Sequence, residues 1–266
     1  FKDQNYSRGI FNSNWVGLKN FAFLFRTKDA WIMTRNTILY NLAFIIFGTI
    51  LAIVVAILMV EIAKSFMSKL FQLSFILPAL ISTVVISYIV YAFLNTESGL
   101  INNSILAKLG MEGISWYVEK KFWPYILVIV YLWKSFGYST IIYMASIAGI
   151  DKSLYEAAKI DGASKLSQIK NITIPLLKPT VIILTLMSVG RIMNSDFGLF
   201  YQVPMNSGAL YSVTQTIDTF VYRAMMQLND MGMATASGLY QSLVGFILVM
   251  IANGIVRKVD HENALF

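Results

Sequence analysis

Five long stretches that carry at most one charged residue each dominate this chain of 266 residues. A helix needs about 20 apolar residues to cross the hydrocarbon core of a bilayer, and a helix that crosses it satisfies its own backbone hydrogen bonds there. The stretches do not show the alternating segments of roughly ten residues that are typical of membrane β-barrels. The sequence therefore predicts an all-α, polytopic transmembrane protein with spans at 37–60, 70–94, 122–150, 179–194 and 233–256.

The composition agrees with a chain whose surface largely faces lipid. Charged residues make up 13% of the sequence, whereas a soluble domain carries about 25%. The net charge of +7 is better explained by lysines at the membrane surface than by nucleic acid, so we expect membrane lipid and no nucleic acid as a partner. Cysteine is absent and His261 is the single histidine, so we expect no metal site.

The connections between the predicted spans differ in character. The segment 151–178 holds five lysines and no apolar run long enough to span, whereas 195–232 is long and mixes aromatic with polar residues. The density of Lys and Arg favours a cytoplasmic location for 151–178, which by alternation also places 61–69 and the C-terminal tail inside. The N-terminal segment 1–36 is basic as well, so charge alone does not fix this orientation.

One connection has a local pattern of its own. Ser153 and Glu156 have the spacing of a capping box, which predicts a helix start, and Gly162 can adopt the left-handed conformation that ends such a helix. A second helical piece fits 164–172, and Pro175 is expected to break it. This predicts a helix–turn–helix at the membrane surface, either as an interfacial loop shaped by lipid headgroups or as a contact site for another protein.

The same segment resembles the EAA loop of binding-protein-dependent ABC importers. That pattern is Glu-Ala-Ala, three residues, Gly, nine residues, and then Ile-x-Leu-Pro. This sequence has Glu156-Ala157-Ala158, three residues, Gly162, nine residues, and then Ile172-Thr173-Ile174-Pro175. The one departure, Ile for Leu, keeps the side-chain volume.

The resemblance covers nearly the whole chain. The segments 1–3, 9–11, 15–21 and 34–37 look like the region that follows the first span of oligosaccharide permeases, and 213–222 and 234–236 also match. The branch that it resembles most imports acidic polysaccharide fragments such as polygalacturonan, rhamnogalacturonan and alginate. Because a span precedes this region in the family, the resemblance implies that the first of six spans is missing here. It further implies an external segment 1–36, a permease domain 37–257 and a cytoplasmic tail 258–266.

The resemblance implies a permease subunit of an ATP-driven importer in the bacterial inner (cytoplasmic) membrane. Such a subunit forms half of a pathway for an oligosaccharide that an extracytoplasmic binding protein delivers, and a second permease subunit forms the other half. The chain has no G-x-x-x-x-G-K-[ST] loop, so we expect no cofactor in it and no enzyme activity, with ATP and Mg bound by two cytoplasmic ATPase subunits. The residues implied in coupling to those ATPases are Glu156, Ala157, Ala158, Asp161, Gly162 and Pro175.

Five residues are candidates for the substrate pathway. Lys134 and Arg191 are the charged residues inside predicted spans, where charge persists only with a cavity, partner or ligand. They could bind an anionic sugar, snorkel to the surface, or pair with the partner permease. Tyr138, Asn194 and Asp196 could stack on or hydrogen-bond to a sugar, although an aromatic residue also suits the membrane interface. Asp196 could instead neutralise Arg191, in which case a neutral glycan would serve equally.

Two other classes of function remain open at this point. A stand-alone secondary transporter or channel would need its own coupling-ion site and is favoured by internal repeats, which are not evident. A membrane enzyme would need clustered acid, base or metal residues near one membrane face, which the sequence does not show. We also expect Gly190, Gly238 and Gly245 to allow close helix packing.

Overall fold

A computed structural model describes residues 1–3, 9–62, 66–227 and 229–259. Most of the predicted tail 258–266, with His261, lies outside the described residues. The regular structure of the described chain is helical, apart from one isolated bridge between Lys2 and Trp15. The prediction of an all-α protein is therefore confirmed.

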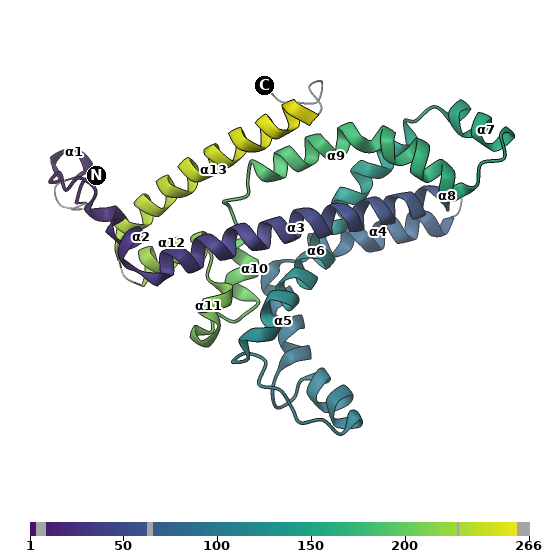
Figure 1. The fold of residues 1–266 in the computed structure, drawn as a ribbon. Helices are drawn as coiled ribbons and strands as arrows, with labels where there is room; N and C mark the ends of the chain where they lie inside the picture. Colours follow the sequence, from purple (N-terminus) through teal and green to yellow (C-terminus); the bar gives the residue numbers. More distant parts are fainter. Residues whose placement is uncertain (4–8, 63–65, 228, 260–266) are drawn as a thin grey trace. The chain divides into compact units, whose positions relative to one another are not determined.

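Four long helices can be followed in Figure 1: α3 (Lys28–Glu61), α6 (Trp123–Ala148), α9 (Ile174–Val189) and α13 (Met231–Val259). By length and composition, four helices of the described chain can cross a membrane, α9 being counted with the helical residues that precede it. A broken pair of helices makes a fifth span if the pair is counted as one. These findings confirm a multi-pass membrane protein.

The second predicted span, 70–94, is not one helix. It consists of α4 (Phe66–Leu80) and α5 (Thr83–Leu94). Pro78 lies inside α4 and removes one backbone donor shortly before its end. Ser82 then caps α5, because its side chain accepts the backbone N–H three residues further on at 3.3 Å. A proline and a good capping residue thus replace one long helix by two.

The fourth predicted span, 179–194, has different limits. Helix α8 (Lys165–Gln168) continues through a π-helical turn, η5 (Ile169–Thr173), into α9, so one helical stretch covers Lys165–Val189. The expected break at Pro175 is wrong, since Pro175 is the second residue of α9. In the π-helical turn η5, each backbone N–H donates to the carbonyl five residues earlier. This shifts the hydrogen-bond register just before Pro175, which has no N–H to donate.

The remaining helices are short and lie between the long ones. Their bounds are α1 (Gly9–Asn12), η1 (Lys19–Phe21), α2 (Ala22–Arg26), η2 (Ile101–Leu106), η3 (Ala107–Leu109), η4 (Lys120–Phe122), α7 (Lys152–Ile160), α10 (Phe197–Gln202), η6 (Gly208–Leu210), α11 (Tyr211–Thr214) and α12 (Ile217–Met226).

The chain divides into two compact units. The first comprises Phe1–Leu42, Ser82–Ile129 and Gly190–Leu248, and the second comprises Ala43–Ile81, Val130–Val189 and the end of α13 from Val249. Helices α3, α6 and α13 therefore contribute residues to both units. The candidate coupling segment belongs wholly to the second unit.

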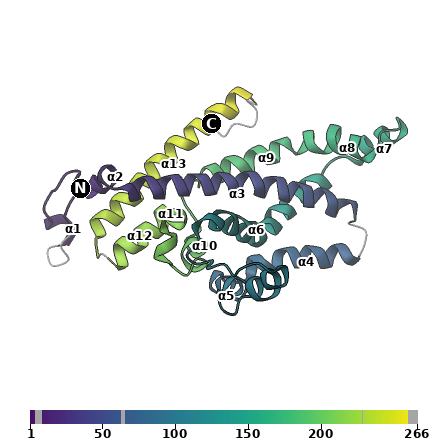
Figure 2. The same ribbon diagram turned by 60° about the horizontal axis from the view of Figure 1, so that its bottom comes forward.

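The first unit has a core to which the polar connection 95–121 contributes residues. Leu94, Leu106 and Trp116 are buried together. The indole N–H of Trp116 donates to Asn102 Oδ1 at 2.8 Å, and that of Trp123 donates to the Trp116 carbonyl at 2.7 Å. In the same unit α10 packs on α5 and α12, and Figure 2 shows α10, α11 and α12 gathered together. The long connections are therefore folded parts of the unit.

The second unit packs three helices around small side chains. Ala52 and Ala56 lie one turn apart on α3 and are fully buried with Tyr143, Ile147 and Leu177. Two alanines at this spacing leave room for neighbouring backbones to come close, as is usual in membrane helix pairs. The core of this unit is thus formed by α3, α6 and α9.

A close backbone approach in the second unit lies at a glycine that we did not expect. A Cβ added at Gly137 on α6 would overlap the carbonyl oxygen of Phe75 on α4. By contrast, a Cβ at Gly238 would meet no atom within 4 Å, and one at Gly245 would make ordinary contact with Met193 at 3.6 Å. Within this chain, the expectation of close packing at Gly238 and Gly245 is therefore wrong.

We predict that Gly137→Ala destabilises the protein and that Gly238→Ala does not. The added methyl group at 137 has to displace backbone, which costs about 1–3 kcal/mol, whereas at 238 the better helix propensity of Ala is neutral or favourable. Thermal unfolding of the two variants in detergent measures the difference. Equal melting temperatures would contradict the close contact between α4 and α6.

Candidate functional site

Helix α7 begins at an aspartate. The Asp151 carboxylate accepts the backbone N–H of Ser153 at 2.9 Å and caps the helix. The predicted capping box of Ser153 and Glu156 is therefore wrong, because Ser153 already lies inside the first turn. Hydrogen bonds from Ser153, that of its backbone N–H first, lower the pKa of the Asp151 carboxyl. This carboxylate is fully exposed, so it is ionised and acts as a cap rather than as a buried charge.

Helix α7 ends as the sequence predicted. Gly162 has φ +77°, in the left-handed region, and the N–H of Ala163 donates to the Ala158 carbonyl at 2.8 Å. This hydrogen bond, which closes a turn of six residues, is typical of a helix that ends at a glycine. Ser164 then starts α8, since its hydroxyl accepts the N–H of Ser167 at 3.3 Å. A sharp, capped turn thus joins the two helices.

Side chains hold this helix–turn–helix to the rest of the second unit. The hydroxyls of Tyr155 on α7 and Thr173 on η5 lie 2.9 Å apart. Lys165 at the start of α8 forms an ion pair of 2.8 Å with Glu61 at the end of α3. A cavity of about 400 Å³ lies between these residues and the ends of α3 and α6. Side-chain contacts therefore hold the segment against the helical core, in addition to its covalent connection through the chain.

One side of α7 has no neighbour within the described chain. Leu154, Ala157 and Ile160 follow each other at a spacing of three and are exposed, with Ile160 at 87%. Glu156 and Lys159 are exposed beside them. Figure 2 shows α7 beyond the end of α8. An exposed apolar row with charged neighbours is typical of a surface that another protein or the membrane interface covers.

The six predicted coupling residues lie in the second unit. Glu156, Ala157, Ala158, Asp161 and Gly162 belong to α7 and the turn that ends it, and Pro175 lies at the start of α9. All are exposed except Ala158, which is half-buried. Their contact with an ATPase stays a prediction.

Two of the predicted pathway residues lie on α6 in the second unit. Lys134 and Tyr138 are one helical turn apart, so they share a face of the helix. Lys134 is half-buried, and Tyr138 is 70% exposed. Gly137 lies between them and makes the close approach to α4 described above. Pathway lining by Lys134 and Tyr138 stays a prediction.

The other three lie in the first unit, around the turn that follows α9. Arg191 is exposed there and is not inside a span as expected, because α9 ends at Val189. Asp196 caps α10 by accepting the N–H of Leu199 at 3.0 Å. Asn194 is exposed, and its Oδ1 accepts from Gln241 Nε2 at 2.7 Å.

This turn is held by polar residues that the sequence analysis missed. Asn41 on α3 donates through Nδ2 to the carbonyls of Ile192 at 3.0 Å and Asn194 at 3.2 Å. Asp218 on α12 accepts the N–H of Ser195 at 2.7 Å and its hydroxyl at 2.6 Å. Asn41 could have been noticed because it is a strongly polar residue in an uncharged span. Asp218 becomes recognisable only in the fold.

A further missed residue is the cation on α12. Arg223 is only 9% exposed. Its guanidinium donates to Gln215 Oε1 at 3.0 Å and lies over the ring of Tyr211 at 4.1 Å. It also donates to Asn206, whose φ of +47° is left-handed. Hydrogen bonds and a cation–π contact thus compensate a buried charge, which gives Arg223 a structural role.

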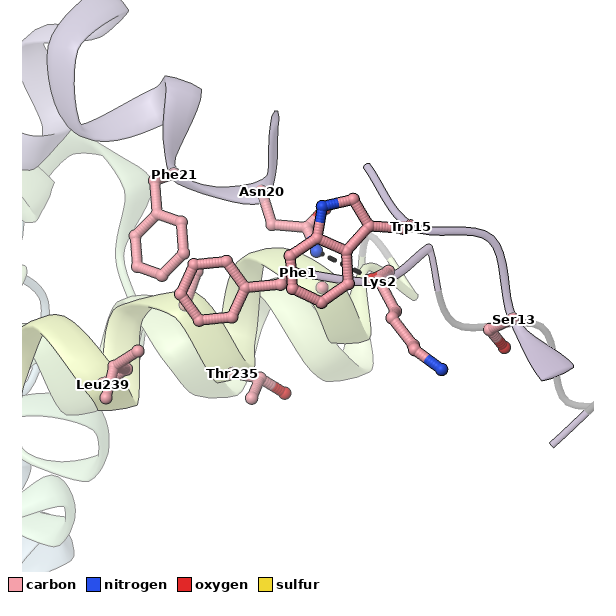
Figure 3. Close-up of a pocket in the computed structure, with 10 residues that line it drawn as sticks. Phe1, Lys2, Ser13, Trp15, Asn20, Phe21, Thr235 and Leu239 are labelled. Atoms are coloured by element: carbon pink, nitrogen blue, oxygen red, sulfur yellow. Dashed lines mark hydrogen bonds between the residues drawn. The ribbon is translucent and has the colours of Figure 1, made fainter. Parts of the chain in front are cut away.

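An aromatic cavity of about 450 Å³ lies in the first unit, where the N-terminal segment meets the start of α13 (Figure 3). The rings of Phe1 and Trp15 stack with centroids 5.7 Å apart. Asn20 Nδ2 donates to the Lys2 carbonyl at 2.9 Å, which holds the segment to itself. Residues 15–21, which were noted for their family resemblance, therefore form one wall of this cavity.

Comparison with known proteins decides the family. Residues 48–261 match the model of the binding-protein-dependent transport system inner membrane component. The chain belongs to this family. It is therefore a transport protein and not an enzyme. The family favours the importer permease over the two alternatives, a membrane enzyme and a stand-alone transporter.

Similar proteins extend the match over nearly the whole chain. The polygalacturonan/rhamnogalacturonan transport system permease protein YteP of Bacillus subtilis (strain 168) is 32% identical over 264 residues, covering 99% of this chain and 81% of YteP. A crystal structure of a bacterial ABC transporter involved in the import of the acidic polysaccharide alginate matches with a TM-score of 0.87 and 28% identity, covering 94% of this chain and 86% of that one. The bacterial alginate ABC transporter in complex with its alginate pentasaccharide-bound periplasmic protein gives 0.85 and 27%, covering 92% and 84%. The resemblance to importers of polysaccharide fragments is therefore confirmed.

We predict that Gly162→Ala loosens the end of α7, whereas Gly149→Ala does not. An alanine in the left-handed conformation costs about 1–2 kcal/mol, and Gly149 has no positive φ and only ordinary contacts for an added Cβ. Hydrogen–deuterium exchange of residues 152–164 measures the effect, and faster exchange is expected in Gly162→Ala alone. The same exchange in both variants would show that the turn does not limit the stability of α7.

Proposed function

We propose that this chain is the permease subunit of an ATP-driven importer and forms half of the translocation pathway for an oligosaccharide. The single observation that carries the proposal is the family match, together with similarity over 99% of this chain to a permease of polysaccharide fragments. The solved structure with the higher TM-score is also a transporter of a polysaccharide, alginate. Sugars of this kind are the substrates named for both relatives.

The proposed partners follow from the same comparisons. An extracytoplasmic binding protein delivers the oligosaccharide, as in the alginate transporter that was crystallised with its periplasmic protein. A second permease subunit completes the pathway in the bacterial cytoplasmic membrane. Two cytoplasmic ATPase subunits bind ATP and Mg and drive transport, since this chain carries no phosphate-binding loop of its own.

The proposed coupling surface is the exposed side of α7. Its apolar row of Leu154, Ala157 and Ile160 suits an apolar groove on an ATPase, and Glu156 beside it suits a basic residue at the rim of that groove. A helix docked in this way moves with the ATPase when two ATPase subunits close on ATP. This assignment places 151–178 on the cytoplasmic side.

The path from α7 to the membrane supports this coupling. Only the turn at Gly162 separates α7 from the unbroken helical stretch Lys165–Val189. The Tyr155–Thr173 contact bridges that turn at 2.9 Å. A displacement of α7 is therefore passed to a spanning helix through one short joint, and a rigid-body motion of the ATPase can rock the span.

We predict that Glu156→Lys uncouples ATP hydrolysis from substrate but leaves the protein folded. The residue is exposed in a short helix, so the change in unfolding free energy should stay near about 0.5 kcal/mol. At the docked interface, however, like charges would face each other. ATPase activity of the assembled complex, with and without loaded binding protein, is the measurement.

The matched control for Glu156→Lys is Glu112→Lys, the same reversal at an exposed position of the first unit. We expect the control to keep full stimulation by the loaded binding protein. Normal stimulation in assembled complexes of both variants would contradict docking through α7.

We also predict that Lys134→Met and Arg191→Gln each weaken the uptake of acidic glycans more than that of neutral ones. Lys134 lies within a spanning helix, where a cation needs compensation by a partner or ligand. Uptake into reconstituted vesicles, with acidic and neutral oligosaccharides of equal length, measures this. If both variants transport acidic glycans as well as the parent does, these cations do not recognise the substrate.

A further inference from the structure

The turn 190–195 is clamped from three directions inside the first unit. Asn41 on α3 and Gln241 on α13 donate to its carbonyls, and Asp218 on α12 accepts from Ser195. Its backbone is therefore fixed by groups outside the turn. Two of its side chains, Arg191 and Asn194, are nevertheless exposed.

The hydrogen bonds of Gln241 determine which way the Asn194 amide faces. The nearby Met193 carbonyl can only accept, so the Gln241 atom that lies 2.7 Å from it is the amide nitrogen Nε2. The same nitrogen lies 2.7 Å from the Asn194 side chain and donates there too, so the facing atom of Asn194 is Oδ1. A backbone carbonyl thus settles both amide orientations.

This orientation turns the amide nitrogen of Asn194 away from Gln241. No acceptor for Nδ2 is present among the residues that the structure describes, and the side chain is exposed. Arg191, three residues earlier in the same turn, adds a guanidinium, which also has donors and no acceptor. The exposed side of the turn therefore offers hydrogen-bond donors.

The turn lies at the depth of a spanning helix. Gln241 is ten residues beyond the start of α13 at Met231, which is about 15 Å along the helix axis. Polar groups at such a depth are costly unless a cavity, a partner or a ligand meets them. A ligand that meets the exposed donors of Asn194 and Arg191 has to supply hydrogen-bond acceptors.

We propose that Asn194 contacts the carboxylate groups of an acidic oligosaccharide, and that Gln241 is the positioning residue that sets this preference. The inference rests on the proposed function as an oligosaccharide importer. A carboxylate only accepts hydrogen bonds and therefore needs the Nδ2 side of Asn194. A sugar hydroxyl both donates and accepts, so a neutral glycan binds either orientation of the amide.

The decisive variant is Gln241→Glu. A carboxylate at 241 only accepts, so the bonds to the Met193 carbonyl and to Asp218 Oδ1 are lost. The Asn194 amide then turns round, donates to Glu at 241 and presents Oδ1 to the pathway. We expect the half-saturating concentration of a uronic acid oligosaccharide to rise about tenfold, which corresponds to the loss of one charged hydrogen bond. For the same oligosaccharide with its carboxyl groups reduced to alcohols, we expect a change below about twofold. Uptake into vesicles with the complete complex and its binding protein measures both.

A new negative charge could also repel the acidic glycan directly, and a double-mutant cycle separates this effect from orientation. In an Asn194→Ala background there is no amide to turn, so Gln241→Glu should add little further loss for the acidic glycan. The same loss in both backgrounds would mean direct repulsion and would overturn the proposal. Gln241→Met, which is neutral and cannot donate, should raise the half-saturating concentration for the acidic glycan alone.

Four further outcomes are informative. Equal losses for the acidic and reduced glycans, or failure of the variants to assemble with the partner permease, would assign Gln241 a structural role and overturn the proposal. No change in any variant would overturn it as well. In all these cases the parent complex still transports an oligosaccharide, so the proposed function stands. If the parent transports neither glycan, the proposed function itself fails.

Discussion

The backbone's need for hydrogen bonds in hydrocarbon governs the architecture of this protein. A continuous helix meets that need without help, and most of the apolar sequence lies in such helices. Wherever the helix is interrupted, side chains take over. Ser82 caps α5 after the break that follows Pro78, and Asn41 and Gln241 donate to the carbonyls of the turn that follows α9. Polar side chains such as Ser82, Asn41 and Gln241 thus meet the backbone where it leaves the helix.

The sequence predicted features that depend on local chemistry. Long apolar runs located the spans, and Gly162 located the end of α7, because one glycine in the left-handed conformation is enough to end a helix. Two local predictions failed for identifiable reasons. Asp151, and not Ser153, occupies the N-cap position of α7. The π-helical turn η5 allows the helix to continue through Pro175.

Other features required contacts between distant parts of the chain. Asn41, Asp218 and Gln241 come from three helices and meet only at the turn 190–195. Gly137 gave no sign of its role, since the backbone it approaches belongs to a segment about 60 residues earlier, at Phe75. Resemblance to a family indicated the segment 151–178 for coupling and gave no sign that Asp196 caps α10. The periodicity of a sequence shows which residues share a helix face, but it does not show which other segment that face contacts.

The clamped turn also bears on how a protein of this kind changes over evolutionary time. Its backbone is held by Asn41, Asp218 and the Nε2 of Gln241, none of which uses the side chain of Arg191. Exchange of Arg191 therefore leaves the fold of the turn intact while it alters the chemistry on the exposed side. If Arg191 contacts the cargo as proposed, its exchange can change recognition without loss of stability, so a gene copy can drift toward a new cargo through folded proteins.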